Sequence, residues 1–228
     1  TTYSDWILGL LPDKSGYQDG KAGFYDFGAT FSHTFNVRNK LNVYGYYSRD
    51  RFAFNDNEKY GYGNMNISAH WRSFFSETLI GNFSVGYDHY DYLNDETTHP
   101  LEAARLSFAI NQYFAKANFN LDSEKHKLKF GASTLLYNIR SGKYEPLGEE
   151  SVVAFDELQK DKALESAFYL DDEWAVTPKF SLNAGIRYSL YNALGPRSYY
   201  AYQPGTLPSE NTVVDTVKVS GNKIFKTY

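Results

Sequence analysis

The sequence predicts an all-β fold, a transmembrane antiparallel up-and-down β-barrel or a part of one, and three observations support this. Apolar and polar residues alternate with a period of two, as in strands with one apolar and one polar face. The alternating segments run for roughly 13 to 16 residues, well beyond the five or six that are commonest in globular proteins. The connections between them alternate between short and long.

The clearest alternation lies in residues 64–71 and 180–191. In the first segment Met65, Ile67 and Trp71 occupy one side, and asparagine, serine and histidine residues occupy the other. A helix would scatter these two sets around its circumference. Strands are expected at residues 23–36, 40–54, 61–75, 79–92, 103–121, 127–141, 164–177 and 179–191, with a partial strand at 2–8 and another beginning near 223.

The phase of the alternation slips within the segment 103–121. Its first apolar residues, such as Phe108, are even-numbered, whereas the later ones, such as Tyr113, are odd-numbered. A β-bulge near Asn111 and Gln112 would explain this slip, because one extra residue exchanges the two faces of a strand.

The connections indicate that the two ends of the sheet differ. Short turns are predicted at 37–40, 76–78, 122–125 and 177–179, and longer connections at 10–22, 55–60, 93–102, 142–163 and 192–222. Every other turn of a meander lies at the same end, so one end is tight and the other carries long loops, as in outer-membrane barrels. A short helix is expected within 142–163, and an extra hairpin strand outside the membrane at 212–219.

Composition agrees with a barrel and excludes several other classes. Tyrosine (21) and phenylalanine (17) are abundant, and aromatic residues favour strands and membrane interfaces. There is no cysteine, so disulfides and thiolate metal sites are excluded. A net charge of −4 does not indicate nucleic-acid binding. No run approaches the roughly 18 apolar residues of a transmembrane helix.

Two stretches carry a resemblance to a known family. The run Ala163-Leu-Glu-Ser-Ala-Phe-Tyr-Leu-Asp-Asp-Glu-Trp174 leads into the turn Val176-Thr-Pro-Lys179 and then Phe180-Ser-Leu-Asn-Ala-Gly-Ile-Arg-Tyr188. This pattern resembles TonB-dependent receptors of the outer membrane. The opening Tyr3-Ser-Asp-Trp6 resembles the group of these receptors that carries an N-terminal carboxypeptidase-regulatory-like domain.

The resemblance implies a 22-stranded barrel filled by an N-terminal plug, and a TonB box that docks the energy-transducing protein. Nothing in residues 1–228 resembles a plug or a TonB box, and both ends look cut. The chain is therefore expected to be a central barrel segment of about eight to ten strands. A complete eight-stranded barrel is the alternative.

The implied function is active import of an unidentified nutrient across the outer membrane of a Gram-negative cell, energised by TonB through the plug. The expected partners are outer-membrane lipids, the protein's own plug, the TonB complex indirectly, a surface lipoprotein and an unknown substrate; nucleic acid is not among them. No cofactor, no metal site and no enzymatic activity are expected.

The polar strand faces are predicted to line the lumen, where they would position the plug and substrate. The candidates are Asn66, Ser68, His70, Arg72, Asn82, Ser84, Asp88, Asn183 and Arg187. A hydrolytic pair of His70 and Ser84 has no supporting motif. Metal binding by Asp88 and His89 is disfavoured because consecutive strand residues point to opposite faces.

Two other classes of protein remain open. One is a passive outer-membrane barrel or binding protein without a plug. The other is a soluble glycan-binding β-sandwich, in which Tyr199, Tyr200 and Tyr202 would form a stacking platform. Detergent dependence separates the sandwich from the barrels, and the sequence upstream of Thr1 separates a transporter from a passive barrel.

Overall fold

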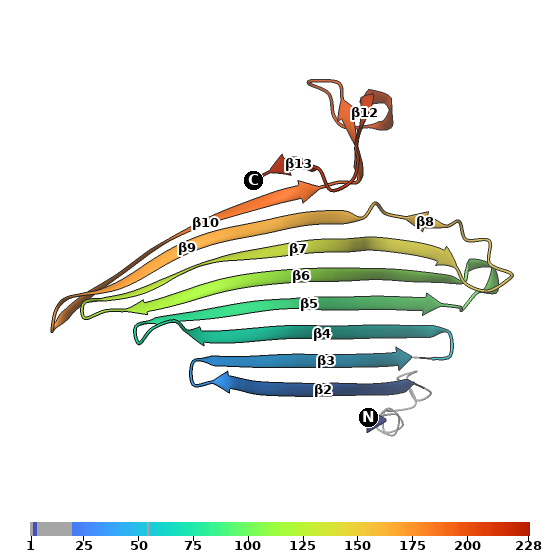
Figure 1. Cartoon of the computed structure of the whole chain (residues 1–228). Helices are drawn as coiled ribbons and strands as arrows, with labels where there is room; N and C mark the ends of the chain where they lie inside the picture. Colours follow the sequence, from blue (N-terminus) through green and yellow to red (C-terminus); the bar gives the residue numbers. More distant parts are fainter. Residues whose placement is uncertain (1, 4–19, 54) are drawn as a thin grey trace.

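The computed structural model describes residues 2–3, 20–53 and 55–228, which form one large antiparallel sheet and a small hairpin (Figure 1). The large sheet has eleven strands in the order β1-β2-β3-β4-β5-β6-β7-β9-β10-β13, with β8 paired to β7. Its long strands are β2 (Lys21–Asn36), β3 (Asn39–Ala53), β4 (Glu58–Phe74), β5 (Leu79–Glu96), β6 (Ala104–Asp122), β7 (His126–Pro146), β9 (Asp161–Thr177) and β10 (Phe180–Leu194). The short strands are β1 (Thr2–Tyr3), β8 (Asp156–Glu157) and β13 (Ile224–Thr227).

All the long strands predicted from the period of two are present; β3 and β6 have the predicted length, and the other six are longer than predicted. They range from 15 residues in β3 to 21 in β7. Pairing along them is nearly continuous; β4 and β5, for example, pair from Glu58 and Glu96 to Phe74 and Ile80. Among the described residues, no helix is long and apolar enough to cross a membrane.

The two ends of the sheet carry different connections, and we call them the turn end and the loop end. The turn end holds the tight turns at 37–38, 75–78, 123–125 and 178–179. At the loop end, 97–103, 147–160 and 195–223 are longer, but the connection from β3 to β4 is only residues 54–57. The predicted strict alternation of lengths is therefore wrong at this connection, because β4 begins earlier than the sequence indicated.

The predicted bulge at Asn111 and Gln112 is also wrong. These residues pair with His89 and Asp88 in an uninterrupted ladder between β5 and β6. The phase slips because Leu106, Phe108 and Ile110 are apolar residues of the otherwise polar face. The register shifts instead between β6 and β7, where the stretch from Arg140 to Lys143 has one residue more than the stretch from Ser107 to Ala109 opposite it.

The two longest connections differ in how well the sequence anticipated them. The predicted helix within 142–163 is absent, since β7 continues to Pro146 and β8 adds a second, short pairing to it. The hairpin was predicted correctly: β11 (Arg197–Tyr202) and β12 (Val213–Val219) form a separate two-stranded sheet that projects from the loop end (Figure 1). Strand β13 pairs with β10, as expected near residue 223.

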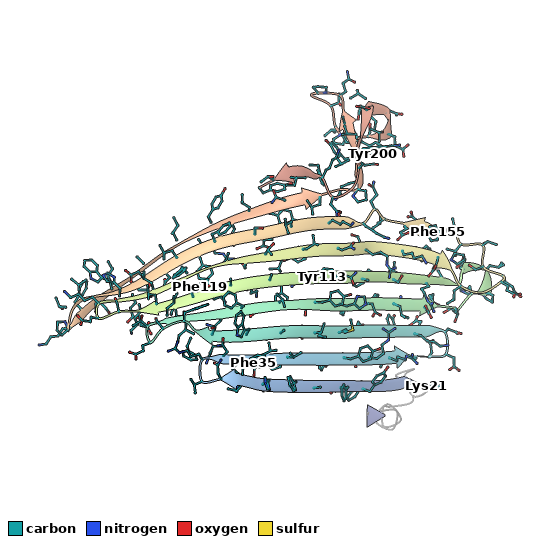
Figure 2. All side chains as sticks on the ribbon, viewed as in Figure 1. Lys21, Phe35, Tyr113, Phe119, Phe155 and Tyr200 are labelled. Atoms are coloured by element: carbon teal, nitrogen blue, oxygen red, sulfur yellow. The ribbon has the colours of Figure 1, made fainter. Side chains whose placement is uncertain are left out.

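The large sheet is open: its pairing path begins at β1 and ends at β13. Strand β1 confirms the start of the predicted strand 2–8, and the remainder of that prediction lies outside the described residues. The two broad faces of the sheet extend from β2 to β10, and side chains project from both of them (Figure 2).

Candidate functional site

One face of the sheet carries a continuous apolar band. Residues directly opposite each other in an antiparallel ladder point to the same side, so the pairing connects Ile67, Tyr87, Tyr113 and Leu136 across four strands. The band also includes Phe27, Phe31, Val43, Met65, Trp71, Phe83, Val85, Ala115, Ala117, Phe119, Leu128, Phe130, Ala132, Phe168, Leu170, Leu182, Ile186 and Tyr188. Many are strongly exposed; Ile186 is 73% and Val85 56% accessible.

The height of the band matches a membrane. In β6 it extends from Tyr113 to Leu121, about nine residues, and tilted strands of about 9–11 residues cross a bilayer. Tyr113 and Phe119, labelled in Figure 2, belong to it. An exposed apolar surface of this extent is unusual on a soluble monomer.

Aromatic rings border the band on both sides. Near the turn end, Trp71, Phe83, Phe119 and Phe130 form a chain across β4 to β7, with successive ring centroids 5.2, 5.6 and 5.1 Å apart. Toward the loop end, the rings of Tyr87 and Tyr113 lie 4.8 Å apart. The Tyr87 hydroxyl donates a hydrogen bond to Asn111, one row beyond the band, at 2.6 Å. Aromatic girdles with their polar groups directed away from the apolar layer are typical of membrane barrels.

Charged residues take over on this same face beyond the girdle at the loop end. Arg49 Nη1 lies 2.6 Å from Asp91 Oδ2. The Arg105 guanidinium donates to both carboxylate oxygens of Asp95 at 2.6 and 2.7 Å, and these hydrogen bonds raise the pKa of Arg105. On β3, β5 and β6 the face therefore changes from apolar to ionic within a few residues.

The opposite face holds every residue that the sequence nominated for the lumen. On β4 and β5 they form direct cross-strand pairs: Asn66 with Asp88, His70 with Ser84, and Arg72 with Asn82. Ser68, on the same face of β4, is buried. The pairing rows place Asn183 and Arg187 of β10 on this face as well, but β6, β7 and β9 separate them from the others.

Hydrogen bonds form within these cross-strand pairs. Asn66 donates to Asp88, and Arg72 Nε donates to Asn82 at 3.2 Å. Two hollows lie on the part of this polar face that β3 to β6 form. One, of about 350 Å³, is lined by Tyr46, Asn64, Asn66, Asp88, Tyr90 and Gln112 among others. The second, of about 310 Å³, is lined by Lys40, Asn42, His70, Arg72, Asn82 and Ser84 among others.

His70 and Ser84 do meet, with Nδ1 and Oγ 2.8 Å apart. The His70 ring also contacts Tyr44 edge-on at 5.3 Å. Nucleophilic catalysis needs the base to be oriented by a third group, and the side chains around the second hollow include no carboxylate. The geometry is that of a hydrogen-bonded pair in a basic hollow.

Asp88 and His89 point to opposite faces, as the strand alternation predicts. His89 instead contacts Asp91 (Nε2 to Oδ1, 3.3 Å) and Asn111 (2.8 Å) on the apolar face. Within the described ranges, no three histidine, cysteine or carboxylate side chains gather as metal ligands.

The sequence reasoning did not nominate several residues that belong to the polar face. Gln112, Lys116, Asn118 and Asn120 of β6 lie opposite Asp88, Ser84, Asn82 and Ile80. The signal was available, because these even-numbered positions alternate with the apolar residues Tyr113 to Leu121. The Tyr169 hydroxyl of β9 reaches across β7 and donates to Asn118 at 2.6 Å.

At the turn end, Asp172 lies on the apolar face, opposite Leu128 and Ala184. It accepts a hydrogen bond from His126 Nδ1 at 2.7 Å. The His126 ring stacks on Trp174, with centroids 5.8 Å apart. This cluster adjoins the tight turn at 178–179 and so lies at the margin of the apolar band.

A meander of long strands with one exposed apolar face, aromatic girdles and one polar face defines the wall of a transmembrane β-barrel. The sequence matches the family described as TonB dependent receptor-like, beta-barrel, over residues 2–222. The chain therefore belongs to this family of outer-membrane transport barrels. A search among curated proteins gives no sequence match.

Two solved structures show the same fold. The copper transporter OprC superposes with a TM-score of 0.65 at 10% identity, covering 87% of this chain and 33% of that one. BauA, the ferric preacinetobactin receptor from Acinetobacter baumannii, gives a TM-score of 0.60 at 14% identity, covering 78% of this chain and 35% of that one. The chain thus spans about a third of the length of these structures.

Proposed function

We propose that this chain forms part of the wall of an outer-membrane barrel that imports a nutrient by active transport. The observation that carries the proposal is the pairing of an exposed apolar band with a polar face on the same strands. A band of this height fits a bilayer, and the polar face fits a water-filled lumen. The family match supports transport as the activity.

In this proposal the polar face lines the lumen. Asn66, Arg72 and Asp88 would contact a plug domain encoded outside the chain, and TonB would act on that plug. The two hollows supply hydrogen-bonding groups without a reactive constellation, so these residues would hold and position rather than react. The loop end would face the cell exterior, where the β11–β12 hairpin would take part in substrate capture.

The predicted sidedness of the strands can be tested with single cysteines, because the chain contains none. Ile186→Cys and Arg187→Cys are neighbours on opposite faces of β10. After spin labelling in vesicles, we expect the label at 186 to collide mainly with oxygen and the label at 187 with a water-soluble nickel chelate. Equal accessibility of the two sites to both reagents would contradict a membrane-crossing strand.

Transport itself is tested by uptake in cells. We expect deletion of the gene to abolish growth on the limiting nutrient, and deletion of TonB to give the same defect. Growth that depends on the gene but not on TonB would indicate the alternative, a passive barrel. An intact protein that is monodisperse without detergent would contradict both barrel hypotheses.

A further inference from the structure

The polar face is rich in aromatic side chains between the row of Asp88 and the loop end, a region that we call its loop-end half. One row crosses four strands, from Asp50 of β3 through Tyr62 and Tyr92 to Phe108 of β6. The ring centroids of Tyr62 and Tyr92 lie 5.2 Å apart, and Tyr92 stacks on Phe108 at 4.7 Å. The interior of a water-filled barrel is usually polar, so this aromatic row indicates a contact surface. The phase change in β6 marks its position.

The loop-end half also has a net negative charge among the described residues. Asp26, Asp50 and Asp88 form no ion pair within the described part of the chain. None of the described strand positions around them on this face, from β2 to β7, is a lysine, arginine or histidine. On the apolar face at the same level, by contrast, Asp91 and Asp95 each contact an arginine. Aromatic rings beside unpaired carboxylates form a surface that attracts cations.

Asp88 lies in a hollow of this half. The hollow, of about 350 Å³, is also lined by Tyr46, Tyr90 and Ile110. Pockets that hold small ligands usually have about 300–1,000 Å³. Asp88 accepts a hydrogen bond from Asn66 through Oδ1, and its Oδ2 accepts none within the described residues. One carboxylate oxygen is therefore available to a ligand.

We propose that this hollow binds the ammonium group of an organic cation, and that the aromatic row contacts the apolar remainder of the same molecule. Asp88 would neutralise the charge. Tyr46 and Tyr90 would hold the cation by cation–π attraction, which acts within about 6 Å of a ring centroid. The inference rests on the proposed function, because it takes the polar face to be the lumen and the cation to be the imported nutrient. Asp88 would then face both the plug and the substrate.

The composition of the surface favours an organic cation over three other ligands. The carboxylates would repel an anion. A neutral carbohydrate would stack on the rings but would leave the negative charge unbalanced. A metal ion needs several converging ligands, roughly six to eight oxygens for calcium. No three histidine, cysteine or carboxylate side chains gather in this way within the described ranges.

The test uses three probes that share a phenyl ring and differ in charge. They are 2-phenylethylamine, which is cationic at neutral pH, 2-phenylethanol, which is neutral, and 3-phenylpropanoate, which is anionic. Isothermal titration calorimetry measures their binding to the intact protein in lipid nanodiscs, with maltotriose as a carbohydrate probe. We expect the amine to bind about tenfold more tightly than the alcohol, and the propanoate and maltotriose not to bind. Amine binding no tighter than that of the alcohol, or binding of maltotriose without the amine, would overturn the proposal.

Variants locate the site. Asp88→Asn should remove the preference for the amine and leave the binding of the alcohol unchanged, which excludes a folding defect. Tyr90→Leu should weaken amine binding by about threefold, whereas Tyr90→Phe keeps the ring and should not. Asp171→Asn changes a carboxylate of the same face near the turn end, and this matched control should have no effect. A preference for the amine that survives Asp88→Asn would contradict this site.

The two hypotheses fail in different ways. If uptake of the nutrient depends on TonB but the protein does not prefer the amine, only the ligand class is wrong. If the protein binds the amine through Asp88 but uptake does not depend on TonB, active transport is wrong and the site stands.

Discussion

Arg49 on β3 and Asp91 on β5 form an ion pair across the strand that separates them, with Nη1 and Oδ2 2.6 Å apart. Strand β4 contributes Gly63 at this point, so no side chain intervenes. Both partners are mostly buried, with side-chain accessibilities of 22% and 24%. The pair therefore depends on a glycine in a third strand, and it ties together strands that do not hydrogen-bond to each other.

Gly63→Ala should break this pair. A Cβ at residue 63 would overlap both the Arg49 guanidinium and the Asp91 carboxylate. We expect a loss of about 1–3 kcal/mol in the free energy of unfolding, as for other overpacked sites. Urea unfolding measures it. Gly45→Ala is the control, since nothing lies within 4 Å of its Cβ on the same face. Equal stability of both variants would show that the pair tolerates displacement.

Tyr169→Phe should cost about 1 kcal/mol, because it removes the hydrogen bond to Asn118 across β7. Gly131 lies beneath the Tyr169 ring and leaves it room, so Gly131→Ala should cost more. Tyr188→Phe is the matched control on β10, since the Tyr188 hydroxyl makes no hydrogen bond within the described residues. Thermal unfolding in vesicles distinguishes the three variants. A Tyr169→Phe protein as stable as Tyr188→Phe would exclude a contribution from this bond.

Val85→Lys should destabilise the protein by about 2–4 kcal/mol, the usual cost of a basic residue at the bilayer midplane on a lipid-facing strand. Val85 lies mid-band between Ala69 and Ala115, so the new ammonium would have no polar neighbour opposite it on either adjacent strand. Ser189→Lys, on the polar face of β10, should change stability little. If both variants unfold at the same urea concentration in vesicles, the apolar face is not in lipid.

The loop from β5 to β6 should loosen at acid pH. Hydrogen bonds from the Thr98 hydroxyl and amide lower the pKa of Glu96 below its usual 4.5. A carboxylate with a lowered pKa contributes stability above pH 4.5 and loses it as the pH falls through the folded-state value. We therefore expect pepsin to cleave residues 97–103 faster as the pH falls below 4.5.

Thr98→Val removes the side-chain hydrogen bond that lowers the pKa of Glu96 most, so cleavage of this variant should increase less as the pH falls below 4.5. Thr97→Val is the control, because the Thr97 hydroxyl donates to the uncharged carbonyl of Asn57. An equal increase of cleavage below pH 4.5 in the two variants would rule out Glu96 as the titrating group.

Much of the fold could be predicted from the sequence because the structure of a strand is local. The side on which a residue lies is set by its own strand, so the apolar band from Tyr113 to Leu121 and the polar residues of β4 and β5 could be assigned correctly. The tight turns could be placed for the same reason. The phase change in β6 misled the prediction, because a bulge and an apolar stretch on the polar face produce the same local pattern.

The sequence by itself determined that this protein is a sheet of long strands with one apolar and one polar face. Only the tertiary structure decided which residues meet across strands. Arg49 and Asp91 are separated by 42 residues, and Tyr169 and Asn118 by 51. Such contacts depend on the register of several strands and on glycines between them, and no local pattern encodes both. The charged rows above the apolar band became recognisable only through that register.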